Sequence, residues 1–368
     1  MAVAPLAAEH AAESERSRTL APEVVAALRD GGLFRMLVPA AIGGGEVHPD
    51  EAYRAISELA AGDGSAAWVT AVASTAGLIA AFLDEEVAAQ IAGTPEALSC
   101  GVFAPKGKAR IEGDELVFSG RWPLASGVDH ADWIGLGCLV AQGEGPPAYR
   151  YAILPSAEVE VIDTWRALGL RATASHDVAV EDARVPMERT TALFTDAPRF
   201  DGPLYRFPVF GILALAIAAV CSGIARSALD ALVALATEKT PAGSSRKLAE
   251  RATVQARIAE SEAALRAARA LGAEAIAAAW AQAEERDEVD LDHRLGLRLA
   301  ATNAARTATA VTEAAHDLAG VSGVYEGSPL ERAFRDVHVA RQHMVVAPAT
   351  YELGGRLLLG LETDTTQL

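Results

Sequence analysis

The chain has 368 residues, of which 51% are hydrophobic and only 5% aromatic, and its formal net charge is −17. This length is sufficient for two or three structural units around a large core. A strongly acidic chain repels phosphate backbones, so the charge argues against nucleic acid as a partner.

Helical patterns fill the first part of the chain. Residues 1–13 are alanine-rich but contain acidic residues and lack a basic segment, so they do not resemble a signal peptide. Asp50 is expected to cap a helix with apolar residues at helical spacing. The segment 63–65 ends that pattern, and a nearly all-apolar helix is predicted over residues 68–82. We therefore predict an N-terminal all-α domain over residues 1–97.

From about Leu98 the pattern changes toward the two-residue period of β-strands. The pair Gly113-Asp114 lies between two short alternating runs, which is typical of a hairpin. Apolar strands are expected at residues 133–140 and 151–155, and a broken alternation predicts another at 177–185. These strands predict a small central β domain, a sheet or a barrel, over residues 98–195.

The remainder of the chain is predicted to be helical again, as a four-helix bundle over residues 196–368. Apolar residues recur at spacings of three and four. Long antiparallel helices separated by polar joints are typical of such a bundle, and they are expected at residues 212–238, 248–286, 293–318 and 329–360. The longest apolar run, residues 209–221, is too short to span a bilayer and suits a buried core helix.

The sequence contains three cysteines: Cys100, Cys138 and Cys221. They form no C-x-x-C pair, which argues against a disulfide framework and against a zinc site. With neither a signal peptide nor a membrane span indicated, we expect a cytoplasmic protein that has no bound metal and no membrane partner.

The order of helices, strands and helices is shared with acyl-CoA dehydrogenases, and three parts of the sequence resemble that family. The loop at residues 39–45, with the segments 57–60 and 63–68, resembles the N-terminal signature. Residues 116–127 resemble the strand and loop that meet the flavin. Residues 184–186 resemble the exit from the β domain. The resemblance implies an α+β, acyl-CoA dehydrogenase-like fold.

A closer resemblance is to the two-component flavin monooxygenases built on this fold, and it rests on residues 163–175, 239–251 and 334–343. It implies that a separate flavin reductase supplies reduced FMN or FAD. It also implies that the chain oxygenates a small organic substrate, expected to be aromatic, through a C4a-(hydro)peroxyflavin. Family members complete the flavin site with a neighbouring subunit, so the resemblance implies a homotetramer, or at least a dimer.

His343 follows the Arg335-Asp336 pair, near which dehydrogenases of the family carry a catalytic glutamate. A dehydrogenase base must be an unprotonated carboxylate, whereas an imidazole suits a flavin peroxide because it can hydrogen-bond and shuttle a proton near neutral pH. We predict that His343 is catalytic and lies on the last helix. The alternative is a histidine that faces solvent or a subunit contact.

Two other functions remain open from the sequence. The tripeptide Tyr325-Glu326-Gly327 is similar to a dehydrogenase motif, so Glu326 could act as the base of an acyl-CoA dehydrogenase. The chain could also be a non-catalytic homologue with a structural or binding role. Retention of flavin separates the last hypothesis from the other two, and oxygen consumption with reduced flavin separates the first two.

The resemblance also implies flavin-binding residues. Ser126 is expected to meet the N5/O4 edge of the flavin and to take part in catalysis, because a hydroxyl both donates and accepts. Trp165 is expected to pack on the ring system, and Thr173 and Ser175 to offer hydroxyl groups. Arg246, in a basic joint, is expected to bind a flavin phosphate. The alternatives are a turn serine for Ser126, core packing for Trp165 and a solvated joint for Arg246.

One feature departs from the monooxygenase pattern. Related enzymes often carry a histidine after the tryptophan that corresponds to Trp68, but residues 69–82 contain none. His130 and His176, on loops of the β domain, could replace it, although such histidines are commonly surface residues. The substrate-side acid-base group therefore stays open.

Overall fold

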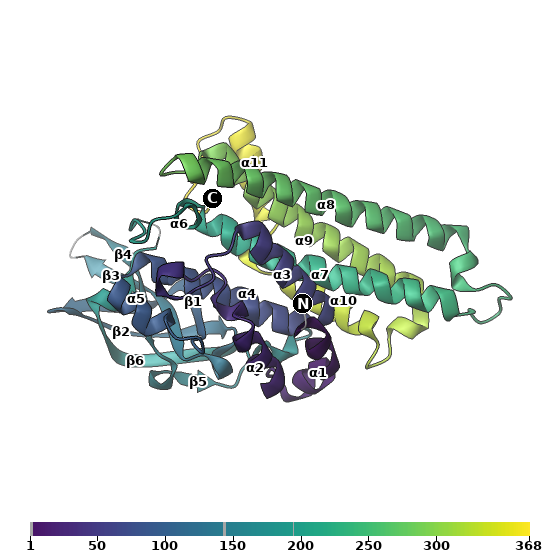
Figure 1. The fold of residues 1–368 in the computed structure, drawn as a ribbon, viewed down its shortest axis with the longest axis horizontal. Helices are drawn as coiled ribbons and strands as arrows, with labels where there is room; N and C mark the ends of the chain where they lie inside the picture. Colours follow the sequence, from purple (N-terminus) through teal and green to yellow (C-terminus); the bar gives the residue numbers. More distant parts are fainter. Residues whose placement is uncertain (1–2, 143–144, 194) are drawn as a thin grey trace.

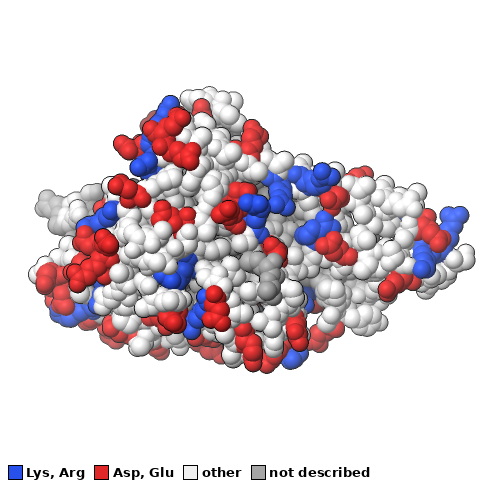
Figure 2. Space-filling view, in the orientation of Figure 1, with Lys and Arg blue, Asp and Glu red and all other residues white. Residues whose placement is uncertain are grey.

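The computed structural model describes residues 3–142, 145–193 and 195–368. Figure 1 shows a short-helix part and a β-sheet at one end of the molecule, and long helices that extend away from them. The predicted α+β order of helices, strands and helical bundle is confirmed. In Figure 2, Asp and Glu side chains gather along the lower edge of the view, where the sheet and the first two helices lie.

The N-terminal part consists of helices joined by 3-10 turns: α1 (Val3–Ser17), α2 (Pro22–Asp30), α3 (Pro49–Gly62), α4 (Gly64–Leu78) and α5 (Glu85–Ala92). The expected cap at Asp50 is wrong by two residues. The His48 ring accepts a hydrogen bond from the backbone N–H of Asp50, and Pro49 begins the helix. Asp63 caps α4 by accepting from the N–H of Ala66 at 2.7 Å.

The strands form one open sheet in the order β5-β6-β2-β1-β3-β4-β7. Their bounds are β1 (Ser99–Glu112), β2 (Glu115–Ala125), β3 (Trp133–Gln142), β4 (Gly145–Pro155), β5 (Glu160–Ile162), β6 (His176–Pro186) and β7 (Thr190–Thr191). The predicted hairpin is confirmed, because Glu112 pairs with Glu115 across a turn in which Gly113 has a φ of 66°.

The C-terminal part contains α6 (Pro203–Arg206), α7 (Val209–Glu238), α8 (Ala252–Glu285), α9 (Leu291–Ala319), α10 (Pro329–Ala340) and α11 (Ala349–Leu358). The single helix predicted for residues 329–360 is wrong, because the chain breaks between Ala340 and Ala349. Pro348 lies in that break, and a proline in a helix interior removes a hydrogen bond and clashes with the preceding turn. His343 therefore does not lie on a long helix but caps the 3-10 turn η10 (Met344–Val346).

Helix α7 is the centre of the bundle and packs against α3, α4, α9 and α10. The segment Gly64–Phe82 and α7 are apolar enough to cross a membrane, but 89% and 72% of their most apolar windows are buried inside the fold. The prediction of a buried core helix at residues 209–221 is thus confirmed. Packing within one chain accounts for the apolar character of α7, which therefore gives no support to an oligomer.

Candidate active site

Three buried hydroxyl groups form a hydrogen-bonded chain beside α4. Ser126, in the loop after β2, has its Oγ 2.7 Å from the Oγ of Ser175. Ser175 Oγ lies 2.6 Å from Thr173 Oγ1, and both residues belong to the loop that leads into β6. The fold therefore brings together three of the predicted flavin-contacting residues. Two of them, Ser126 and Ser175, are 49 positions apart in the sequence.

The direction of this chain is fixed by the groups at its two ends. Trp68 Nε1 donates to Ser126 Oγ at 3.0 Å, and Thr173 Oγ1 donates to the carbonyl of Leu170 at 2.9 Å. An indole N–H can only donate and a carbonyl can only accept. The protons therefore run from Trp68 through Ser126, Ser175 and Thr173 to Leu170. Each hydroxyl proton is committed, so Ser126 can only accept a further hydrogen bond.

The loop that carries this chain is held in a costly backbone conformation. Leu170 and Ala174 have φ angles of 49° and 44°, and left-handed residues other than glycine cost on the order of 1–2 kcal/mol each. Several contacts offset this cost. Asp336 Oδ1 accepts from the N–H of Leu170 at 2.6 Å, Trp165 Nε1 donates to the Leu170 carbonyl at 3.0 Å, and Gly127 N–H donates to the Thr173 carbonyl at 2.8 Å.

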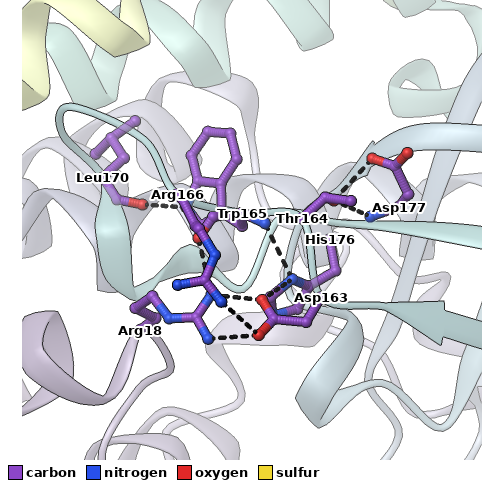
Figure 3. A network of polar contacts seen from close by, with 8 residues as sticks. All are labelled: Arg18, Asp163, Thr164, Trp165, Arg166, Leu170, His176 and Asp177. Atoms are coloured by element: carbon purple, nitrogen blue, oxygen red, sulfur yellow. Dashed lines mark hydrogen bonds and ion pairs between the residues drawn. The ribbon is translucent and has the colours of Figure 1, made fainter.

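Ion pairs fix the outer side of the same loop (Figure 3). Both terminal nitrogens of Arg18 donate to Asp163, at 2.5 and 2.8 Å, and this contact lowers the pKa of Asp163 to about 2. His176 Nδ1 accepts from the N–H of Trp165 at 3.3 Å. In Figure 3 the indole of Trp165 points away from the Arg18–Asp163 pair. The Trp165 ring is partly buried and packs against the core, so its predicted role beside a flavin stays a prediction.

The His343 ring lies edge-on to the Trp68 ring, with 5.8 Å between the ring centroids. Its Nδ1 accepts from the N–H of Val345 at 3.4 Å, so the proton of the neutral ring resides on Nε2. Burial, assisted by the positive charge of Arg298, lowers the pKa of His343 to about 4. At neutral pH His343 is therefore a neutral donor through Nε2, rather than a group that titrates near pH 7 as the sequence suggested.

Two buried carboxyl groups lie behind the hydroxyl chain. Burial raises the pKa of Asp336 to about 7 and that of Asp63 to about 6. A Cβ on Gly64 would lie 3.3 Å from Asp336 Oδ2, so the start of α4 passes directly beside this carboxyl. Asp336 thus connects α10, α4 and the loop at Leu170. In the sequence, Asp336 is noticeable only as part of the Arg335-Asp336 pair.

Arg246 and Glu326 lie away from this group within one chain. Arg246 is exposed in the connection between α7 and α8, at the end of the bundle opposite the sheet (Figure 1). Glu326 is exposed in the turn before α10, whereas His343 follows that helix. Twelve helical residues span about 18 Å. Within one chain, α10 therefore separates Glu326 from His343.

The two loop histidines have identified contacts of their own. His130 Nε2 lies 3.0 Å from Thr19 Oγ1, and burial lowers its pKa. His176 lies 3.6 Å from Asp163 in addition to its contact with Trp165. Through these contacts, both histidines lie near the segment between α1 and α2. Neither of them is hydrogen-bonded to the hydroxyl chain by these contacts.

The sequence interpretation missed Trp68 as a functional residue, although it marked the start of an apolar helix. Its one signal was a donor-only side chain among small residues: Ser65, Ala66, Ala67 and Ala71. No cluster of His, Cys, Asp or Glu that could hold a metal ion occurs among the residues described by the structure.

Two family models match the chain. The acyl-CoA dehydrogenase N-terminal domain matches residues 2–92, and the acyl-CoA dehydrogenase C-terminal domain matches residues 215–348.

Similar proteins cover nearly the whole chain. It is 34% identical to an indole-3-acetate monooxygenase of Pseudomonas putida, over 95% of this chain and 89% of that protein. It is 30% identical to the oxygenase component of an FADH(2)-dependent resorcinol hydroxylase from Rhizobium sp. (strain MTP-10005), over 98% of this chain and 93% of that protein. The solved structure of XiaF from Streptomyces sp., in complex with FADH2 and glycerol, superposes with a TM-score of 0.91 at 25% identity, covering 98% of this chain and 94% of that one.

Proposed function

Because the chain belongs to the flavin-dependent monooxygenases of the acyl-CoA dehydrogenase family, we propose that it is an oxygenase component that receives reduced flavin from a separate reductase and inserts one atom of dioxygen into a small aromatic compound. The observation that carries this proposal is the directed hydroxyl chain that ends at Ser126, beside Trp68 and His343. Relatives named for indole-3-acetate and resorcinol support an aromatic substrate.

The hydrogen-bonding capacity of Ser126 fits a reduced flavin. When bound, reduced flavin supplies the electrons that activate dioxygen. Its N5 carries a proton that oxidised flavin lacks, and Ser126 has a free lone pair but no free proton. Ser126 would accept from N5–H, Trp165 would pack on the ring system, and the fixed loop around Thr173 and Ser175 would hold both in place. FMN and FAD share this part of the molecule.

His343 would supply the second polar contact. Its Nε2 holds a proton at neutral pH, since Nδ1 is an acceptor and the ring pKa is about 4. A fixed, neutral N–H donor stabilises negative charge that develops on an oxygen atom without giving up its proton. The edge of Trp68 limits how the ring can turn. This arrangement differs from that of a dehydrogenase, which needs a carboxylate base.

A homo-oligomer, expected to be a tetramer, and a cytoplasmic location belong to the same proposal. Leu358 and Leu359, at the end of α11, are each 77% exposed, and Leu361 follows them. The top of the view in Figure 2, where α11 ends, is largely white, although charged side chains lie beside it. Exposed leucines of this kind are expected where another copy covers the surface. In such an assembly Arg246 of a neighbouring copy would reach a flavin phosphate. Light scattering that gives the mass of a monomer at working concentration would contradict the oligomer.

The test of the function uses the full chain with chemically reduced FMN or FAD, indole-3-acetate and ¹⁸O₂. The expected result is one ¹⁸O atom in the organic product, detected by mass spectrometry, without a reductase in the mixture. Oxidation of an acyl-CoA to an enoyl-CoA in the absence of oxygen would overturn the proposal. Failure of the chain to bind reduced flavin at micromolar concentration would overturn it as well.

A further inference from the structure

Arg298, on α9, is a buried cation without a carboxylate partner among the described residues. Arg298 is only 3% exposed, and burial lowers the pKa of its guanidinium to about 10. A buried charge is costly unless it is paired and hydrogen-bonded. A chain with 49 acidic residues could readily have supplied a partner. Within the described residues, the charge of Arg298 is therefore not compensated by a carboxylate.

One edge of the Arg298 guanidinium is only weakly used. Nη1 donates to the carbonyl of Gln367. Nε is buried with no hydrogen-bond partner in the described structure, and Nη2 makes one long hydrogen bond, of 3.4 Å, to Thr350 Oγ1. Nε and Nη2 together form the fork that binds a carboxylate through two parallel hydrogen bonds. A carboxylate on this edge would take the free Nε–H and replace the long contact to Thr350.

Arg35 shows how this chain satisfies a buried arginine that has a structural role. Arg35 is also buried, at 8% exposure. Its Nε and Nη2 donate to the carbonyl of Ala92 at 3.1 and 2.8 Å, and Nη2 also donates to the carbonyl of Ile42. Among the described residues, no carbonyl accepts from the corresponding edge of Arg298.

Arg298 lies within reach of the candidate active site. Its guanidinium is 5.8 Å from the centroid of the Phe210 ring, at the start of α7. Helix α9 packs against α7 and against the turn η10, which His343 caps. The positive charge of Arg298 also contributes to the lowered pKa of His343. An anion on the free edge of Arg298 would therefore sit close to Phe210 and to the turn that positions His343.

We propose that the Nε–Nη2 edge of Arg298 binds the carboxylate of an anionic aromatic substrate, beside the Phe210 ring. This inference rests on the proposed function and narrows its substrate class to aromatic acids. Arg298 is then a specificity-determining residue that holds the substrate through its acid group and takes no part in oxygen transfer.

The test compares two probes of nearly equal shape, indole-3-acetate and its neutral amide, indole-3-acetamide. Their affinities are measured by anaerobic calorimetry with the full chain bound to reduced flavin. The parent is expected to bind the acid at least about 10-fold more tightly than the amide. Arg298→Gln is expected to weaken binding of the acid by about 10- to 100-fold, as is typical for loss of a charged hydrogen-bond pair, and to leave the amide unchanged.

Two further variants control for folding and for general charge. Arg298→Lys keeps the charge but loses the planar fork, so it is expected to weaken binding of the acid only, even if Arg298→Gln proves unstable. Arg294→Gln, one turn earlier on α9, removes an arginine whose partner is Glu288 at 3.6 Å and is expected to change neither affinity. Thermal unfolding of each variant verifies that it is folded.

Equal binding of acid and amide by the parent, binding of neither, or parallel weakening of both in Arg298→Gln would overturn the inference. Its failure can be told apart from failure of the proposed function. If the parent incorporates ¹⁸O into neutral aromatic compounds and does not prefer acids, the proposed function stands and the carboxylate site is refuted. If the parent binds the acid through Arg298 but incorporates no ¹⁸O, the carboxylate site stands and the proposed function is refuted.

Discussion

Thr173 Oγ1 donates a hydrogen bond to the Leu170 carbonyl at 2.9 Å, and this contact sets the direction of the hydroxyl chain that begins at Ser126. Because the one hydroxyl proton of Thr173 goes to that carbonyl, Ser175 must donate to Thr173 and Ser126 must donate to Ser175. Trp68 Nε1 donates to Ser126 Oγ at 3.0 Å and occupies one of its two lone pairs. Ser126 Oγ can therefore only accept a further hydrogen bond, and reduced flavin would donate one from N5–H.

Removal of the middle member of this chain should weaken the discrimination between reduced and oxidised flavin. In Ser175→Ala the Ser126 proton loses its acceptor and becomes free to donate to the N5 of oxidised flavin. We expect the dissociation constant for oxidised flavin, divided by that for reduced flavin, to fall by about 10-fold, which corresponds to one hydrogen bond. The measurement is a pair of titrations, one anaerobic with reduced flavin and one with oxidised flavin. Ser156→Ala, which removes a hydroxyl bonded to the Ala131 carbonyl, is the control, and an unchanged ratio in Ser175→Ala would refute the directed chain.

The buried carboxyl of Asp336 should make stability depend on pH. Its pKa is raised to about 7 in the folded chain, above the value of about 3.9 expected when unfolded. The folded state then binds the proton more tightly, so the stabilisation is complete below about pH 4 and is lost as the pH rises through 7. In Asp336→Asn this loss is absent while an acceptor for the Leu170 N–H is kept.

The measurement for Asp336 is urea unfolding of parent and Asp336→Asn at pH 5 and pH 7. The variant is expected to gain on the order of 1–2 kcal/mol relative to the parent over this interval. Comparison of the two proteins cancels the titrating groups that do not interact with Asp336. Asp63 does interact with it and contributes to the raised pKa of Asp336, so the measured difference belongs to the pair. A difference that stays constant between the two pH values would show that Asp336 is ionised throughout.

The charge of Arg298 should be detectable at His343. The pKa of His343 is lowered to about 4, first by burial and then by Arg298. Arg298→Gln is therefore expected to raise this pKa while leaving it below the ordinary value of about 6.5, because the burial remains. NMR titration of the ring protons in parent and variant measures the change. An identical His343 titration in both proteins would place Arg298 too far away to act on the site.

The fold was predictable where the signal is local. The Gly113 hairpin and the apolar start of α7 both follow from patterns within about a dozen residues. The apolar spacing continues across Pro348 and predicts one helix, whereas the proline ends the regular helix there. The spacing likewise does not fix the first residue of α3, which begins at Pro49 with His48 as its cap.

The site was predictable only in part. Ser126, Thr173 and Ser175 were found through resemblance to family segments, and their mutual contacts could not be read from the sequence. Trp68 contacts Ser126 across 58 positions, and Asp336 contacts Leu170 across 166. Such pairs are created by tertiary packing and leave no periodic pattern. Arg298 was missed for the same reason, since its burial is invisible in the sequence of a helix that also carries exposed arginines.

The proposed role of the site in directing oxygen onto a substrate can be measured as the ratio of organic product to hydrogen peroxide in parent and His343→Ala. His343 offers one fixed donor through Nε2, and loss of such a contact costs on the order of 10²-fold in rate. We expect His343→Ala to bind reduced flavin nearly as tightly as the parent, and most of the oxygen that it consumes to appear as peroxide. An unchanged ratio of product to peroxide in His343→Ala would refute this role and leave His343 with a structural role only.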